Sequence, residues 1–76
     1  MKKIVTIDPE IMSGMPIFTG TRVPIKNLFD YLETGESLET FLDDFPSVTK
    51  EHATMILEQA EKLLFTTYES LNETAA

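Results

Sequence analysis

Three runs of apolar residues at helical spacing most constrain the fold of this chain of 76 residues. Apolar residues that recur three and four positions apart line one face of an amphipathic helix, and such a face must be buried against another element. Because short loops join the three runs, the pattern predicts one compact trihelical unit over residues 25–65. The predicted stripes are Ile25, Leu28, Phe29 and Leu32; Leu38, Phe41, Leu42 and Phe45; and Ala53, Ile56, Leu57, Ala60 and Leu64.

The residues around the second stripe are typical of helix ends. Gly35 follows the first stripe as a C-terminal stop, since glycine adopts the left-handed backbone that commonly ends a helix. Ser37 is the predicted N-cap of the second helix. Pro46 disfavours helical backbone in the residue before it, so the second helix is predicted over residues 37–45.

The third predicted helix spans residues 49–65, with Thr49 or Ser47 as its N-cap. After it the apolar pattern weakens, and residues 66–76 form an acidic C-terminal tail. This tail either prolongs the third helix or frays, and the sequence leaves both alternatives open.

Residues 1–24 precede the helices and carry the signals of a short hairpin. A β-branched run at residues 4–7 is stopped by Asp8 and Pro9, which predicts a strand. Gly20 supplies the permissive backbone of a tight turn that follows a second extended piece. The chain is therefore predicted to be mainly α, with a short N-terminal strand or hairpin followed by three helices, in a single domain.

Composition argues against several classes of function. The chain has no cysteine, which removes disulfides, thiol nucleophiles and thiolate metal sites. Its one histidine, His52, has no second nitrogen ligand, and no serine has a nucleophile elbow, so we expect neither a metal site nor an enzyme. No cofactor is implied. The chain lacks an apolar run long enough to cross a bilayer and a secretory signal, so we expect a cytoplasmic location.

The net charge of −7 is unevenly distributed. Residues 1–26 carry a net charge of +2, whereas residues 27–76 carry −9. Nucleic-acid affinity depends largely on Lys and Arg neutralising phosphates, so the acidic part suits a basic protein partner better than a phosphate backbone.

Two segments of the sequence resemble a known family: IDPEIMSGMPIFTGTRVPI and LFDYLETGESLETFLDDFPSVTKEHATMIL. Their ordered motifs, Asp-Pro, Gly-Thr-Arg-Val-Pro, Gly-Glu-Ser and Asp-Phe-Pro, are similar to those of domain of unknown function family 433. The resemblance implies a homeodomain-like helix-turn-helix preceded by a short β-hairpin. It also implies an antitoxin of a toxin–antitoxin pair, since members often occur beside a PIN-like nuclease. It transfers no catalytic residue.

A helix-turn-helix built on the second and third helices would present the first turns of the third helix to a major groove. Polar side chains there can contact phosphates or base edges, helped by the basic N-terminal region. Glu51 would repel the DNA backbone, so a trihelical fold used only for protein contacts is the alternative, and His52 alternatively has a surface or capping role. The candidate DNA-binding residues are Arg22, Lys26, Thr49, Lys50, His52 and Thr54.

Arg22 is a rare cation in this acidic chain, and two roles are open to it. Its guanidinium can bind a phosphate, RNA or a partner's carboxylate through paired hydrogen bonds. Alternatively it braces the hairpin by bonding loop carbonyls or pairing with Asp8 or Glu10.

The acidic C-terminal half is predicted to cover a basic toxin surface, and the open edge of the strand at residues 4–7 to pair with a second copy, giving a homodimer. The sequence therefore predicts a dimeric antitoxin that neutralises a PIN-like nuclease and binds operator DNA. The alternative is a protein-interaction adaptor with a trihelical fold and no DNA binding. The candidate partner-binding residues are Glu58, Glu61, Tyr68 and Leu71.

Overall fold

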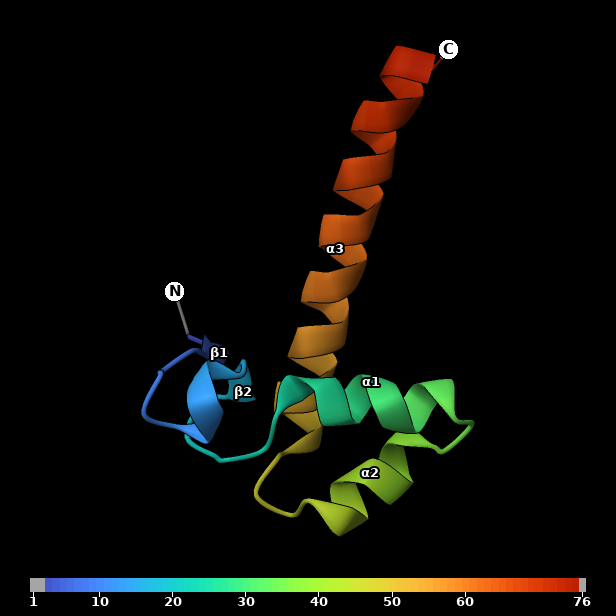
Figure 1. The fold of residues 1–76 in the computed structure, drawn as a ribbon. Helices are drawn as coiled ribbons and strands as arrows, with labels where there is room; N and C mark the ends of the chain where they lie inside the picture. The colour runs from blue at the N-terminus through green and yellow to red at the C-terminus, as the bar shows by residue number, and fades with distance from the viewer. Residues whose placement is uncertain (1–2, 76) are drawn as a thin grey trace.

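The computed structural model describes the backbone of residues 3–75 and the side chains of residues 3–71. Over this range a short two-stranded hairpin is followed by three helices, so the predicted mainly α architecture is confirmed (Figure 1). In chain order the elements are the strand β1 (Val5–Thr6), the 3-10 turn η1 (Met12–Gly14), the strand β2 (Ile17–Phe18) and the helices α1 (Ile25–Glu33), α2 (Leu38–Asp44) and α3 (Lys50–Ala75).

The strands β1 and β2 form an antiparallel pair, and β1 is one residue shorter at each end than predicted. Val5 lies opposite Phe18 and Thr6 opposite Ile17. The Thr6 and Thr19 hydroxyls hydrogen-bond across the pair at 2.8 Å. An isolated two-stranded ribbon of this length is only marginally stable in water. Its position therefore depends on Phe18, whose side chain is fully buried in the core.

A tight turn joins β2 to the segment that leads into α1. The Thr21 N–H donates to the Phe18 carbonyl at 3.0 Å and closes a four-residue turn whose third residue, Gly20, has a φ of 84°. Glycine adopts this left-handed backbone without a steric penalty. The Thr21 hydroxyl donates to the same carbonyl and accepts from the Val23 N–H, so this side chain holds both sides of the turn.

The predicted ends of the first two helices are confirmed. The chain leaves α1 at Gly35, which has a φ of 89° and donates its N–H to the Leu32 carbonyl. The N-cap of α2 is Ser37, whose side-chain oxygen accepts from the Thr40 N–H at 3.1 Å. The helix ends two residues before Pro46.

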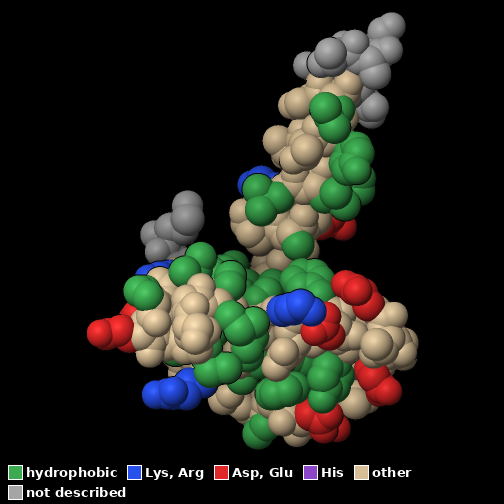
Figure 2. Space-filling model, in the orientation of Figure 1, with side chains coloured by type: hydrophobic (Ala, Val, Ile, Leu, Met, Phe, Trp, Pro, Cys, Tyr) green, Lys and Arg blue, Asp and Glu red, His purple; other side chains and the backbone are tan. Residues whose placement is uncertain are grey.

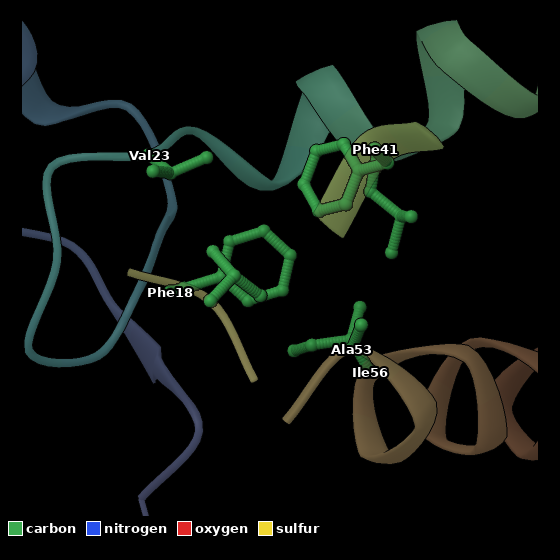
Figure 3. Close-up of a cluster of buried hydrophobic side chains, with 7 residues drawn as sticks. Phe18, Val23, Phe41, Ala53 and Ile56 are labelled. Carbon is green, nitrogen blue, oxygen red and sulfur yellow. The ribbon is translucent and has the colours of Figure 1, made fainter. Parts of the chain in front are cut away.

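One hydrophobic core joins the hairpin to the helices. Phe18 of β2 and Phe41 of α2 converge with Ala53 and Ile56 of α3 (Figure 3). The two phenyl rings are fully buried with centroids 6.0 Å apart. Each buried aromatic ring stabilises the fold by about 2–3 kcal/mol, which makes these rings the main fixed points between the hairpin and the helices. The buried cluster comprises Phe18, Val23, Leu28, Phe41, Val48, Ala53 and Ile56.

The helix α3 leaves this core after Ala60. Every described side chain from Glu61 to Leu71 is exposed, and Figure 1 shows this part of the helix rising alone from the rest of the molecule. We call residues 3–60 the body and residues 61–75 the projecting segment. The radius of gyration is 14.4 Å, against about 11 Å for a compact chain of this length.

The structure settles the two alternatives for the tail and corrects two core predictions. Leu32, predicted in the first stripe, is 37% exposed at the end of α1. The helix α3 continues through Ala75 instead of fraying after residue 65. Leu64, predicted to belong to the core stripe, is 55% exposed. The reason is geometric, because no described part of the body lies opposite this turn of α3 (Figure 1).

Candidate functional site

The projecting segment carries the largest run of exposed apolar side chains among the described residues. Figure 2 shows hydrophobic side chains along this part of α3, on both edges of the helix in that view. Small monomeric proteins rarely expose contiguous apolar surface of this kind unless it binds something. The side chains and their exposed fractions are Leu63 60%, Leu64 55%, Phe65 59%, Tyr68 56% and Leu71 54%.

These residues continue the row that faces the core lower in the same helix. Leu57 packs against the core, and Leu64 and Leu71 follow it at steps of seven residues. Residues seven apart on an α-helix lie two turns apart on nearly the same face. Leu63 and Phe65 widen this face on its two sides. The same face of α3 is therefore packed against the core within the body, whereas its side chains are exposed in the projecting segment. We call residues 63–65, 68 and 71 the apolar face.

Acidic side chains flank the apolar face. Glu58 and Glu61 are exposed where α3 leaves the body, and Glu69 is exposed toward its far end. The basic residue Lys62 lies among these acidic residues and is also exposed. A molecule that covers the apolar face would therefore meet a rim of net negative charge.

The four residues predicted to bind a partner lie on or beside this face: Glu58, Glu61, Tyr68 and Leu71. The prediction missed the largest part of the surface, residues 63–65. Three consecutive apolar residues span about 200° around a helix, so they cannot all face one core. This run was the signal in the sequence that a second surface exists.

The predicted DNA-binding residues at the start of α3 are mostly engaged within the fold. Thr49 is the N-cap, and its hydroxyl accepts from the His52 N–H at 3.0 Å. The Thr54 hydroxyl donates to the Lys50 carbonyl at 2.8 Å. Of these four residues, Lys50 presents an exposed charge to solvent.

His52 ties α3 to the N-terminal strand. Its Nε2 lies 2.8 Å from the carbonyl oxygen of Ile4. Because a carbonyl only accepts, Nε2 carries the hydrogen of this bond. The ring also packs edge-on against Phe18, with centroids 5.1 Å apart. The imidazole therefore joins the hairpin to α3, which the sequence could not indicate because 48 positions separate the hydrogen-bonded residues.

The two N-terminal cations predicted to bind DNA lie at the surface. Arg22 is exposed and forms no hydrogen bond or ion pair with the described residues, so the expected brace to Asp8 or Glu10 is wrong. Lys26 donates to both carboxylate oxygens of Asp30 at 2.9 Å. This hydrogen bond, and then the charge of Asp30, hold the pKa of Lys26 above its ordinary value.

A groove of about 320 Å³ lies where the hairpin turn meets the start of α3. Residues 19–21 form one wall, and Ser47, Thr49 and His52 line the other. Its hydroxyl groups can hydrogen-bond to a phosphate backbone, but Glu51 also lines it. The structure thus brings the turn next to the predicted recognition helix, while Arg22 and Lys26 do not line the groove.

A tyrosine and an aspartate connect α1 to α2. The Tyr31 hydroxyl donates to Asp44 Oδ2 at 2.6 Å. This hydrogen bond to a carboxylate favours the neutral phenol and raises the pKa of Tyr31 above its ordinary value.

The described residues include neither a cluster of metal ligands nor a membrane-spanning helix. In that part of the chain, no group of three or more histidine, cysteine or carboxylate side chains could hold a metal ion. Likewise, none of the helices described there combines the length and apolarity needed to cross a membrane.

Comparisons with known proteins agree with this fold. The family model described as "Protein of unknown function (DUF433)" matches residues 5–60, so its match ends where the projecting segment begins. "Uncharacterized protein y4eO" of Sinorhizobium fredii is 38% identical over 50 residues, which are 66% of this chain and 23% of that protein. The chain thus spans less than a quarter of this relative. A crystal structure of a DUF433 member protein from Anabaena variabilis has the same fold, with a TM-score of 0.67 at 20% identity, covering 91% of this chain and 68% of that one.

Proposed function

Because the chain belongs to the DUF433 family, whose description assigns no activity, we propose a function from its surface. The protein is a protein-binding module that acts as an antitoxin. Its projecting segment docks on a basic partner, a PIN-like nuclease, and blocks the access of that nuclease to RNA.

The observation that carries the proposal is the bare apolar face between residues 63 and 71. Covering one large apolar side chain contributes about 1.5–3 kcal/mol. The three side chains that share one face, Leu64, Tyr68 and Leu71, are together on the scale needed to offset the cost of association. The spacing of Leu64, Tyr68 and Leu71 is that of a helix that lays one face into a groove of its partner.

The charge around the face selects the chemistry of the partner. Glu58, Glu61 and Glu69 favour a surface with basic groups at its edges. A nuclease must attract RNA phosphates, so its substrate surface is basic. An acidic helix that occupies such a surface competes directly with RNA, and this is the mechanism that we propose for neutralisation.

The test is binding to a PIN-like nuclease encoded beside the gene for this chain. We expect the wild-type chain to bind that nuclease in calorimetry and to stop its cleavage of RNA. The double variant Leu64→Ser with Leu71→Ser should weaken binding by at least about a hundredfold, because two apolar contacts are lost. Leu32→Ser, an exposed leucine of the body, is the matched control and should leave binding unchanged.

Two outcomes would count against the proposal. A wild-type chain that neither binds nor inhibits the nuclease would remove the antitoxin function. A chain that binds a partner through the apolar face without affecting RNA cleavage would instead support the adaptor, in which the trihelical body only presents the docking helix.

Operator binding is the second candidate function. It is supported by the exposed Lys50 at the start of α3 and by the hydroxyl-lined groove beside it. This end of α3 is opposite to the projecting segment, and the helix of 26 residues is about 39 Å long. One chain could therefore contact DNA and a nuclease at once, and a homodimer would present two such ends to one duplex.

Binding of the nuclease and binding of operator DNA are expected to be coupled. A basic nuclease would offset the net charge of −7, so the complex should bind operator DNA more tightly than the free chain. Titrations with and without the nuclease measure this difference, and equal affinities would exclude the coupling. No binding in either case at about 50 mM salt would favour the adaptor without DNA binding.

A further inference from the structure

The outer edge of β1 has unused backbone hydrogen-bonding groups. The Thr19 N–H donates to the Ile4 carbonyl, and Thr6 lies opposite Ile17. The backbone N–H and C=O groups of residues 4 and 6 therefore point toward β2. Since successive residues of a strand alternate, the N–H and C=O of Val5 point away from β2. Neither group hydrogen-bonds to any residue that the structure describes. This edge is a template for one more strand.

A groove of about 590 Å³ lies beside this edge. One wall is formed by residues 3–5, which lead into β1. The other wall is a single face of α3, formed by Met55, Glu58, Gln59 and Lys62. In Figure 2 the corner between the body and the projecting part of α3 is open. A strand added to β1 would therefore pair with its backbone on one side and pack its side chains against α3 on the other.

We propose that this groove receives β1 of a second copy of the chain, in an antiparallel pair centred on Val5. The two Val5 residues would face each other across a two-fold axis, and the N–H of each would donate to the C=O of the other. Lys3 of each copy then lies opposite Ile7 of the other, on the same face of the sheet as Val5. The order of strands would be β2, β1, β1 of the second copy and its β2.

Two further observations favour a second copy as the occupant. Ile7 is 65% exposed directly after β1, and the pairing would cover it with the aliphatic stem of the opposing Lys3. In addition, this register places Ile7, Thr6 and Val5 of the incoming strand opposite Lys3, Ile4 and Val5, so apolar side chains enter a groove that Ile4, Val5 and Met55 line. Pairing two projecting segments would instead bring their acidic rims together.

This dimer does not depend on the proposed antitoxin function, and one set of variants separates the two. Sedimentation velocity of the full chain at micromolar concentration should give a dimer. Ile7→Lys places a lysine opposite Lys3 at both ends of the pair, and should raise the dimer dissociation constant by about a hundredfold. Because Ile7 is exposed in a single chain, the circular dichroism spectrum should remain that of the folded protein.

The double variant Lys3→Glu with Ile7→Lys tests the register. It places a glutamate opposite a lysine at each end, and the dissociation constant should return to within about tenfold of the wild-type value. Leu64→Ser is the matched control on the projecting segment and should leave the dimer intact. A monomeric wild-type chain, a double variant that stays monomeric, or loss of the dimer in Leu64→Ser would each overturn the proposal.

Discussion

The two halves of α3 have the same apolar spacing and opposite surroundings. In the body, Ala53 and Ile56 are buried and Leu57 packs against the core. In the projecting segment, Leu64 and Leu71 continue the same row and are more than half exposed. Helical periodicity therefore identifies an apolar face, but it does not identify what covers that face, which can be the same chain or another molecule.

The difference has an energetic consequence. The body is held by a shared core of aromatic and aliphatic side chains, whereas the described side chains of the projecting segment are exposed. An isolated helix of about 15 residues is marginal in water, because helix stability in proteins comes mostly from tertiary packing. The body should unfold as one cooperative unit, and the projecting segment should open independently of it.

The largest expected contrast is between two phenylalanine truncations. Phe41→Ala removes a fully buried ring and should cost about 3–5 kcal/mol, which is the whole stability of a domain of this size. Phe65→Ala removes a ring that is 59% exposed and should change the free energy of unfolding by no more than about 0.5 kcal/mol. Urea titrations followed by circular dichroism measure both. A loss above about 1 kcal/mol for Phe65→Ala would mean that the projecting segment packs on the body.

Hydrogen exchange should show the same contrast along one helix. The Ile56 amide, in the part of α3 that packs on the core, should exchange only on global unfolding, with protection of several hundredfold or more. The Leu64 amide should exchange through local opening at a rate near that of a short free helix. Uniform protection along α3 in the dilute free chain would contradict the division between the body and the projecting segment.

The smallest expected effect concerns two tyrosines. Tyr31→Phe removes the hydrogen bond to Asp44 and should slightly lower the melting temperature at pH 7–9, whereas Tyr68→Phe in the projecting segment should not. The pKa of Tyr31 is raised in the folded state, so its contribution is fully present below the unfolded pKa of about 10. That contribution is lost as pH rises through the folded pKa.

Melting curves of the wild type and both variants from pH 7 to pH 11 provide the measurement. The gap between the wild type and Tyr31→Phe should close as the pH passes 10. A gap that widens with pH would mean that Asp44 contributes in some other way than by accepting this hydrogen bond.

Most of the fold could be predicted from local signals in the sequence. The capping role of Ser37 and the left-handed backbone of Gly35 and Gly20 act over a few residues, and the structure has each of them. The apolar stripes placed α1 and α2 within one or two residues of their observed limits. These features were predictable because turn geometry and helix capping depend on neighbours in the chain.

The roles of individual polar residues were less predictable. His52 bonds to a carbonyl 48 positions away, and Arg22 lacks the brace that two nearby carboxylates suggested. Thr21, which the sequence did not single out, holds the turn with its hydroxyl. Such contacts depend on which backbone atoms the fold brings within about 3 Å, and residue type alone does not specify them.

The sequence by itself determined the order of elements, the ends of α1 and α2, the start of α3 and the apolar face of each helix, because propensity, capping and periodicity are local properties. Only the tertiary structure decided where the core stops. It showed that the body covers α3 up to Ala60 and leaves Leu64 exposed. The physical reason is that burial depends on which elements lie opposite a residue, and the described hairpin, α1 and α2 all lie against the first part of α3.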